Sequence, residues 1–366
     1  ATLVVLLAAY AFLGRGGAYL GVEPLFISEA GLVLALLTVL TTVGHARLGA
    51  LHWLLVAFAA WGLLRTLPYL GRDGLAALRD AVVWGYAAFA LAISFSVGAA
   101  QFPRVVALYR RGLPFFLLWV PVAAILTLVA PGSVPTIPGS NVGLVEFKGG
   151  DAAVHLSGAA AFLLLGLYAS RSRSGAFGES LLWPVWFAGV AIAVALSRAG
   201  LAAVALAVGV TFLLRPSRRW VPFVVVAVIL LALAQLTNVS VDLGREREVS
   251  LEQVTGNILS VVSESESSEL QGTKDWRMEW WGEIYDYTVR GPYFWTGKGF
   301  GINLADDDGF QVADGSLRSP HNGHMTILAR MGVPGLALWI LVQSVFGLSL
   351  LRAFFRAGLN GDAFWS

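Results

Sequence analysis

Apolar segments long enough to cross a membrane recur throughout this chain of 366 residues. A membrane-spanning helix needs roughly 20 mostly apolar residues. Segments of this kind occur near residues 1–13, 30–44, 48–64, 81–100, 112–130, 153–170, 180–196, 199–214, 220–238 and 332–352. Hydrophobic residues make up 57% of the chain and charged residues 13%, whereas soluble proteins have about 25% charged residues. The sequence therefore predicts an all-α integral membrane protein with about ten transmembrane helices, and its abrupt ends indicate about twelve in the native chain.

The connections between these segments alternate in charge. One set carries a single nearby acid, Glu179, and the arginines Arg47, Arg104, Arg110, Arg111, Arg171, Arg173, Arg215, Arg218, Arg219, Arg352 and Arg356. Connections rich in Lys and Arg stay in the cytoplasm under the positive-inside rule. The other set comprises the connections near 14–29, 65–80 and 131–152, a tight turn at Ser197–Arg198 and a long segment from about 239 to 320. The sequence thus predicts one large loop outside the cytoplasm.

This long loop is acidic and is expected to be partly helical. It holds 15 of the 23 acidic residues against 7 lysines and arginines. Helical spacing of apolar residues argues against disorder, both at Leu251, Val254, Ile258 and Val261 and at Trp276, Trp280, Ile284 and Tyr287. We therefore predict three parts: nine transmembrane helices in 1–238, a loop domain with the candidate catalytic motifs in 239–331, and a last transmembrane helix with a cytoplasmic end in 332–366.

Several classes of chemistry lack the residues that they need. The absence of cysteine excludes disulfides, thiolate zinc sites, iron–sulfur clusters and a cysteine nucleophile. No soluble basic surface is predicted, so nucleic acid is not an expected partner. Gly297–Gly301 lacks the spacing of a dinucleotide or Walker motif, and Asp306–Gly309 lacks that of a calcium loop. We expect no cofactor and no metal, and we expect a tight turn at Gly297–Gly301, with backbone contact to a sugar or phosphate as the alternative.

His321 lies where the acidic loop returns to the membrane, within Ser319–His324. An imidazole titrates near neutral pH, so His321 can serve as a general base at the height of a lipid headgroup. The alternative is a Pro-His-Asn turn that only caps the following helix. His324, three residues later, shares the same helix face, although an interfacial histidine is the simpler interpretation. His155, near the outer end of its span, is a weaker candidate.

Two arginines are candidates for binding an anion. Arg198 lies at an outer turn between two apolar helices, where a charge is costly and by default signals function. Its planar guanidinium can donate to phosphate oxygens in pairs, while the alternative is snorkelling to the interface. Arg277 lies one helical turn before Trp281, whose ring can hold the guanidinium by stacking. Its alternatives are a solvated charge or an ion pair with a neighbouring acid.

Three more arginines, Arg65, Arg72 and Arg79, break the charge pattern because they fall in the predicted outer connection at 65–80. They are expected to form part of a site for anionic headgroups. The alternative for Arg79 is an ion pair with Asp80.

Five short motifs follow one another between about 180 and 345. They are Ser197-Arg198-Ala199-Gly200, Arg277 with Trp280-Trp281, Gly297-Lys298-Gly299-Phe300-Gly301, Pro320-His321-Asn322 and Arg330-Met331-Gly332-Val333-Pro334-Gly335. In order and in membrane placement, the set resembles the bacterial O-antigen ligase and O-antigen polymerase superfamily. Each motif is short, but the ordered set is fairly specific. Arg330 departs from the pattern, because an acid more often precedes this glycine.

The resemblance implies a transferase that moves a glycan from undecaprenyl diphosphate to an acceptor hydroxyl. The transfer would invert the anomeric centre and would need no nucleotide sugar, cofactor or metal. The implied acceptor is lipid A core or another glycan, and membrane lipids are the other partners. The implied location is the bacterial inner membrane, with many spans and the large loop in the periplasm.

The resemblance also implies roles for individual residues. His321 would be the catalytic base, and Arg198 and Arg277 would bind the donor diphosphate. Further substrate contacts are implied for Asn322, His324, Arg318, Gly299 and Trp281.

Other functions compete with that of an O-antigen ligase. A polymerase uses the same donor and similar residues, and the sequence does not separate the two. A transporter or flippase would favour ionisable residues in mid-span and broken helices in matched halves, whereas the predicted spans are nearly free of charge. A non-catalytic membrane assembly protein would tolerate changes at Arg198, Arg277 and His321. These comparisons favour a transferase.

Overall fold

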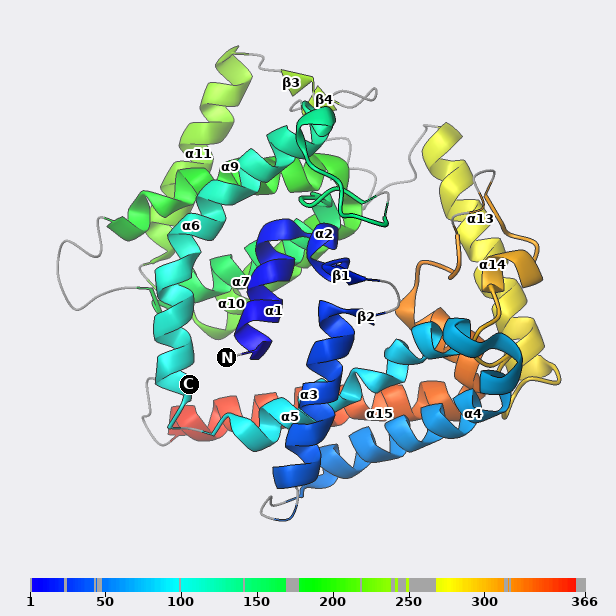
Figure 1. The fold of residues 1–366 in the computed structure, drawn as a ribbon. Helices are drawn as coiled ribbons and strands as arrows, with labels where there is room; N and C mark the ends of the chain where they lie inside the picture. The colour runs from blue at the N-terminus through cyan, green and yellow to red at the C-terminus, as the bar shows by residue number, and fades with distance from the viewer. Residues whose placement is uncertain are drawn as a thin grey trace. The chain divides into compact units, whose positions relative to one another are not determined.

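The computed structural model is mainly helical. It describes residues 2–22, 25–42, 44, 48–98, 100–140, 142–168, 178–217, 219–237, 241–242, 248–249, 268–312, 315 and 317–359. The chain forms two compact units, Ala1–Gly31 with Ala99–Ser265 and Leu32–Gly98 with Glu266–Ser366, and each is described by itself. Two short antiparallel hairpins pair β1 (Gly21–Val22) with β2 (Leu25–Phe26) and β3 (Val241–Asp242) with β4 (Glu248–Val249) (Figure 1).

The first unit consists mainly of apolar helices. Its described helices are α1 (Thr2–Leu13), α2 (Arg15–Ala18), α6 (Phe102–Leu128), the 3-10 turn η2 (Pro131–Ser133), α7 (Gly149–Leu164), α9 (Leu182–Leu196), α10 (Arg198–Leu214) and α11 (Trp220–Thr237). The helix α7 packs against both α9 and α10. Its residues Ala153, Ala159 and Ala160 have no exposed surface. Small side chains at these positions let the neighbouring helices approach closely.

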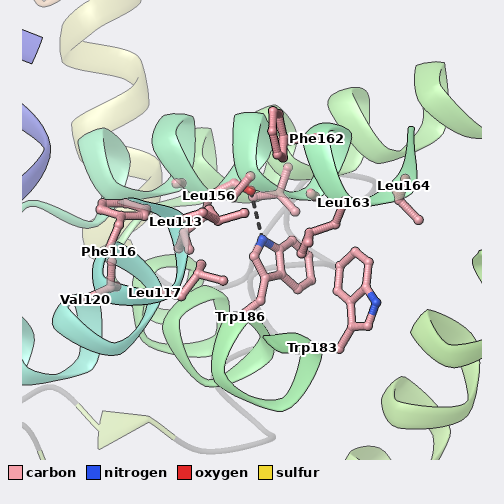
Figure 2. Close-up of a cluster of buried hydrophobic side chains, with 14 of the residues drawn as sticks. Leu113, Phe116, Leu117, Val120, Leu156, Phe162, Leu163, Leu164, Trp183 and Trp186 are labelled. Atoms are coloured by element: carbon pink, nitrogen blue, oxygen red, sulfur yellow. Dashed lines mark hydrogen bonds between the residues drawn. The ribbon is translucent and has the colours of Figure 1, made fainter. Parts of the chain in front are cut away.

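Tryptophan fills the core of the first unit (Figure 2). Trp183 and Trp186 of α9 are each only 1% exposed and share one apolar cluster with Leu156 and Leu163 of α7. The Trp186 indole N–H donates to the Leu156 carbonyl oxygen at 2.8 Å. Because a large aromatic side chain buries about 200 Å², these two rings dominate the packing of α9 on α7.

The second unit is built on two long helices, α4 (Ala50–Gly85) and α15 (Gly323–Leu359), which pack along each other (Figure 1). Each is interrupted by a glycine in the left-handed region, Gly74 at φ 48° and Gly332 at φ 69°. A Cβ at Gly332 would lie 2.4 Å from the Phe294 carbonyl oxygen, so only glycine fits. The unit also contains most of α3 (Ile27–Thr42), α5 (Ala87–Ser96), α13 (Ser268–Tyr285), the π-helical turn η3 (Asp286–Arg290) and α14 (Leu304–Asp307).

Helix length and composition indicate a multi-pass membrane protein. Within the described residues, four helices are long and apolar enough to cross a membrane: Ala50–Gly85, Phe102–Leu128, Gly178–Leu196 and Gly323–Ala357. Shorter apolar helices are Val4–Leu13, Ile27–Thr42, Ala87–Ser96, Ala199–Leu214 and Trp220–Leu230. The predicted helical membrane fold is therefore confirmed. The count of about ten spans and the periplasmic placement of the large loop stay predictions.

The predicted connection at 65–80 is wrong as a loop, because its residues are helical within α4, but it does contain the break of α4 at Gly74. Charged residues interrupt the apolar pattern there, which is why the sequence predicts a loop between spans at 48–64 and 81–100. In the structure, the Arg65 Nε donates to the Thr296 carbonyl oxygen at 2.8 Å, and Asp80 pairs with arginines from other segments. Partners within the protein thus stabilise charges that a helix facing lipid would not tolerate.

The predicted helices of the acidic loop have different outcomes. The helix over Trp276–Tyr287 is confirmed by α13 and η3. The helix over Leu251–Val261 lies outside the described residues. The predicted segment 332–352 is confirmed as helical, within an α15 that begins at Gly323. The division into 1–238, 239–331 and 332–366 depends on membrane topology and stays a prediction.

Candidate active site

His321 has an unusual backbone. Its φ of 52° makes it the one non-glycine residue with a positive φ in the described part of the chain, and it is exposed. This conformation destabilises a non-glycine residue by roughly 1–3 kcal/mol and persists only where the surroundings enforce it. Backbone outliers of this kind cluster at functional sites. The geometry therefore singles out the same histidine as the sequence motif.

The residues on either side of His321 enforce this conformation. The Trp281 indole N–H of α13 donates to the Pro320 carbonyl oxygen at 3.0 Å. Asn322 caps α15, since its Oδ1 accepts from the backbone N–H of His324 at 3.0 Å. The predicted alternative, a Pro-His-Asn turn that caps the helix, is therefore observed. The same turn holds His321 at the surface. Substrate contact by Asn322 and His324 stays a prediction.

Arg277 and Trp281 lie four residues apart on α13 and so share one face of the helix. Arg277 is exposed, and among the described residues its guanidinium makes no ion pair, so the alternative of a salt bridge with Asp275, Glu279 or Glu283 is not observed. Trp281 connects this face to the Pro320–His321 peptide. The structure thus joins Trp281 to the His321 turn and places Arg277 one helical turn earlier on α13, while stacking of Arg277 on the indole stays a prediction.

The predicted tight turn at Gly297–Gly301 is confirmed. Its three glycines have φ values of 59°, 86° and 97°. A Cβ at Gly299 would lie 2.1 Å from the Tyr69 ring, so this glycine is required for packing. The Gly299 N–H donates to the Arg330 carbonyl oxygen at 3.2 Å, and its carbonyl oxygen accepts from Arg330 Nη1 at 3.2 Å. These bonds give Gly299 a structural role, and its contact with a substrate stays a prediction.

Asp80 contacts residues near His321 in a way that the sequence analysis did not predict. Among the described ion pairs, the alternative pair of Asp80 with Arg79 is not observed, and the Asp80 carboxylate instead binds Arg318 at 3.1 Å and Arg330 at 2.9 Å. Arg318, predicted as a substrate contact, therefore lies beside the His321 segment with its guanidinium on Asp80. The presence of Arg330 in an apolar segment was a signal that an acid must lie nearby, but sequence spacing does not connect residue 330 with residue 80.

A second buried network holds the other end of the glycine turn. Lys298 Nζ donates to Asp307 at 2.6 Å and to Asp308 at 2.5 Å. Asp308 also accepts from the Trp280 indole N–H at 2.6 Å and the Tyr287 hydroxyl at 3.3 Å. Burial lowers the pKa of Lys298, but the bonds to both carboxylates raise it more, so the net pKa is above its ordinary value. This network fixes the segment after α14 to α13.

The Ser197–Arg198 turn lies in the first unit. The α9 helix ends at Leu196, and the Ser197 Oγ accepts from the Gly200 N–H at 3.0 Å, which caps α10. A Cβ at Gly200 would lie 2.8 Å from the Ala153 Cβ, so glycine lets the turn pack on α7. The predicted turn is confirmed. The Arg198 side chain lies outside the described part of the structure, and its role at a diphosphate stays a prediction.

His155, the weaker histidine candidate, lines a small cavity in the first unit with Trp119, Lys148 and Asp151. The cavity volume is about 30 Å³. A cavity needs roughly 10–15 Å³ by this measure to hold one water, so the space suits two or three waters. A catalytic role for His155 stays a prediction.

Comparison with known proteins bears on the same stretch of chain. Residues 183–340 match the family model described as O-antigen ligase. This range includes the Ser197–Arg198 turn, Arg277, the glycine turn and His321. No significant match was found among curated proteins or solved structures. The family covers O-antigen ligases and related polymerases, and it implies a glycosyltransferase-like enzyme that uses lipid-linked glycans. The match over residues 183–340, somewhat less than half of the chain, therefore supports membership of the O-antigen ligase superfamily.

Proposed function

We propose that this protein is an O-antigen ligase. It transfers a glycan from undecaprenyl diphosphate to a hydroxyl group of lipid A core, at the periplasmic face of the bacterial inner membrane. The family match over 183–340 supports the reaction class, and the apolar helices support a lipid-linked donor. The observation that carries the site is His321, an exposed imidazole on a strained backbone that Trp281 and Asn322 hold in place.

His321 acts as the general base in this proposal. It accepts the proton of the acceptor hydroxyl while that oxygen attacks the anomeric carbon of the donor sugar. A new glycosidic bond forms, the bond from this carbon to the diphosphate oxygen breaks, and undecaprenyl diphosphate leaves with the electron pair. Attack from the side opposite the leaving group inverts the anomeric centre. An imidazole suits this step because it exchanges protons near neutral pH.

Arginine supplies the electrostatic part of the proposed mechanism. The leaving diphosphate gains negative charge, and one preorganised donor at such a position commonly lowers the barrier by about 3 kcal/mol. Arg277 is suited to this role because it is exposed, has no ion pair among the described residues and shares a helix face with Trp281. Arg198, the first residue of α10, has the same role in the proposal.

Reconstitution tests the proposed role of His321. With a defined undecaprenyl-diphosphate glycan and lipid A core, His321→Ala is expected to lower kcat by about 100- to 10,000-fold, the usual contribution of a general base. Product is measured by mass, and thermal unfolding in detergent confirms the fold. His52→Gln, which changes the histidine in the first turn of α4, is the control and should keep wild-type turnover. Wild-type product from folded His321→Ala protein would refute the assignment.

A polymerase is the second candidate, because the family covers both activities. A deletion strain separates the two functions. Loss of a ligase leaves long chains on undecaprenyl diphosphate. Loss of a polymerase leaves single repeat units on the final acceptor, so that outcome would replace lipid A core with a growing glycan as the acceptor.

Two structural features also suit a transporter. The long helices α4 and α15 are broken at Gly74 and Gly332, and the charges of Asp80 and Arg330 are buried between them. These charges are bound to each other, and Arg330 also binds the glycine turn, so they indicate a packing role. Covalent product in a reconstitution without ATP or an ion gradient favours the transferase, whereas glycan movement without a new bond would favour the transporter.

A further inference from the structure

One carboxylate of α4 connects the chain on both sides of His321. Asp80 Oδ2 accepts from Arg318 Nη2 at 3.1 Å and from Arg330 Nη1 at 2.9 Å, three residues before and nine residues after His321. The same oxygen accepts from the Gly301 backbone N–H at 3.0 Å. Asp80 Oδ1 accepts a further bond from Arg318 Nε at 3.3 Å. A single side chain therefore holds the segment that enters the His321 turn, the helix that leaves it and the glycine turn.

The arginines extend this connection to the backbone. Arg318 Nη2 donates to the Gly301 carbonyl oxygen at 2.9 Å, and Arg330 Nη1 donates to the Gly299 carbonyl oxygen at 3.2 Å. Each guanidinium thus bridges Asp80 and the glycine turn. The planar fork of arginine makes such a bridge rigid, because two donors are fixed in one plane.

Burial makes the connection strong. The side chains of Asp80 and Arg330 are 8% and 3% exposed, whereas that of Arg318 is 26% exposed. A buried charge that loses its partner is costly, so Asp80 and Arg330 hold each other firmly. Arg318 is the more exposed partner, and it transmits the position of Asp80 to the residues just before His321.

We propose that Asp80 is a positioning residue for His321, acting through Arg318 and Arg330. The inference rests on the proposed function, in which His321 is the base. It extends the active site to α4, a helix that lies outside the matched range 183–340. Asp80 itself touches no reacting atom in this proposal. Its carboxylate fixes the backbone of the His321 turn, and a shift of about 1 Å in a reacting group can cost roughly 100-fold in rate.

The main test is a kinetic cycle on the reconstituted full chain. With a defined undecaprenyl-diphosphate glycan and lipid A core, Asp80→Asn is expected to lower kcat by about 100-fold, with KM for the donor changed less than about threefold. Arg318→Gln should lower kcat in the same way. The variant with both changes should be no slower than the slower single variant, because both act through one contact. Asp80→Glu, which keeps the charge, should recover part of the loss.

Several results would overturn the proposal. Wild-type kcat in folded Asp80→Asn protein would show that the carboxylate does not position His321. Losses that multiply in the double variant, or a raised KM in Arg318→Gln alone, would show that Arg318 contacts substrate independently of Asp80. A role limited to stability would lower the yield of folded protein and leave kcat per folded molecule unchanged. Asp286→Asn, which removes an exposed carboxylate paired with Arg290, is the control and should keep wild-type kcat.

The test of the proposal does not require that the Asp80→Asn protein folds. Arg318→Gln leaves the buried Asp80–Arg330 pair intact, so it is expected to fold. If Asp80→Asn fails to fold, Arg318→Gln alone decides: a lower kcat at unchanged KM supports the proposal, and wild-type kcat overturns it. His321→Ala separates this inference from the proposed function. Activity in His321→Ala would refute the base, whereas an inactive His321→Ala with a fully active Arg318→Gln would refute only the positioning role.

Discussion

Two buried clusters of charge hold the glycine turn in the second unit, and their compositions are opposite. In the Asp80 cluster one acid is shared by Arg318 and Arg330. In the Lys298 cluster one base is shared by Asp307 and Asp308. The first has a surplus positive charge and the second a surplus negative charge. In both, the surplus lies on the most exposed member, with Arg318 at 26% and Asp307 at 44% side-chain exposure.

The comparison shows how this fold keeps charge in its interior. The deeply buried members form a neutral pair, Asp80 with Arg330 and Lys298 with Asp308, whose side chains are at most 12% exposed. Desolvation penalises a lone charge far more than a paired one. The two clusters differ in how far apart in the sequence their residues lie. The Lys298 cluster joins residues close together in sequence, whereas the Asp80 cluster joins α4 to the distant segment that carries His321.

The largest expected effect comes from Asp80→Ala. It leaves two guanidinium groups, one of them buried, without a carboxylate, and removing one partner of a buried pair commonly costs about 3–5 kcal/mol of stability. Chemical unfolding in mixed micelles measures the loss. Asp80→Leu combined with Arg330→Met removes both buried charges and should recover most of it. A double variant as unstable as Asp80→Ala would show that the carboxylate stabilises the fold by something other than charge pairing.

Lys298→Met is expected to be milder. It leaves the Asp308 carboxylate buried, but the Trp280 indole and the Tyr287 hydroxyl still donate to it. Loss of a hydrogen bond to a charged group costs about 1.5–3 kcal/mol. The same unfolding measurement applies, with Arg290→Gln at an exposed ion pair as a control that should change stability by less than about 1 kcal/mol. A loss larger than that of Asp80→Ala would reverse the ranking of the two clusters.

The two clusters also show what the sequence can predict. Apolar segments and the tryptophan spacing at 276–287 predicted helices correctly, because local periodicity determines which residues face a core. The glycine turn was also predictable from the local sequence. The helical structure of residues 65–80, with its break at Gly74, was not predictable, because Arg65 and Asp80 find partners more than 200 positions away. A charge in an apolar segment signals that a partner exists, but only the three-dimensional packing identifies it.

The pH dependence of stability should come from the Lys298 cluster. The folded-state pKa of Lys298 is raised by its two carboxylates despite burial, and burial together with Asp308 raises the pKa of Tyr287. A group whose folded pKa exceeds its unfolded value stabilises the protein fully below the unfolded pKa and loses that contribution as pH rises through the folded pKa. Stability should therefore fall above about pH 10. Thermal unfolding measured across this pH range tests the prediction. A wild-type dependence of stability on pH in the double variant Lys298→Met with Tyr287→Phe would contradict it.

The smallest of the expected losses of stability comes from Trp281→Phe. This substitution distinguishes the contribution of Trp281 to stability from its contribution to the conformation of His321. The substitution keeps an aromatic ring and removes one neutral hydrogen bond to Pro320, at a cost of about 1 kcal/mol. Trp280→Phe, one residue earlier, removes a bond to the buried Asp308 carboxylate and should cost more, about 1.5–3 kcal/mol.

The effects of these two substitutions on activity should rank in the opposite order. Without the Trp281 hydrogen bond, the backbone of His321 can leave its left-handed conformation, so kcat should fall about tenfold or more. Trp280→Phe leaves that peptide in place, and its folded fraction should keep wild-type kcat. Equal kcat values for the two folded variants would show that the strained backbone of His321 does not contribute to turnover.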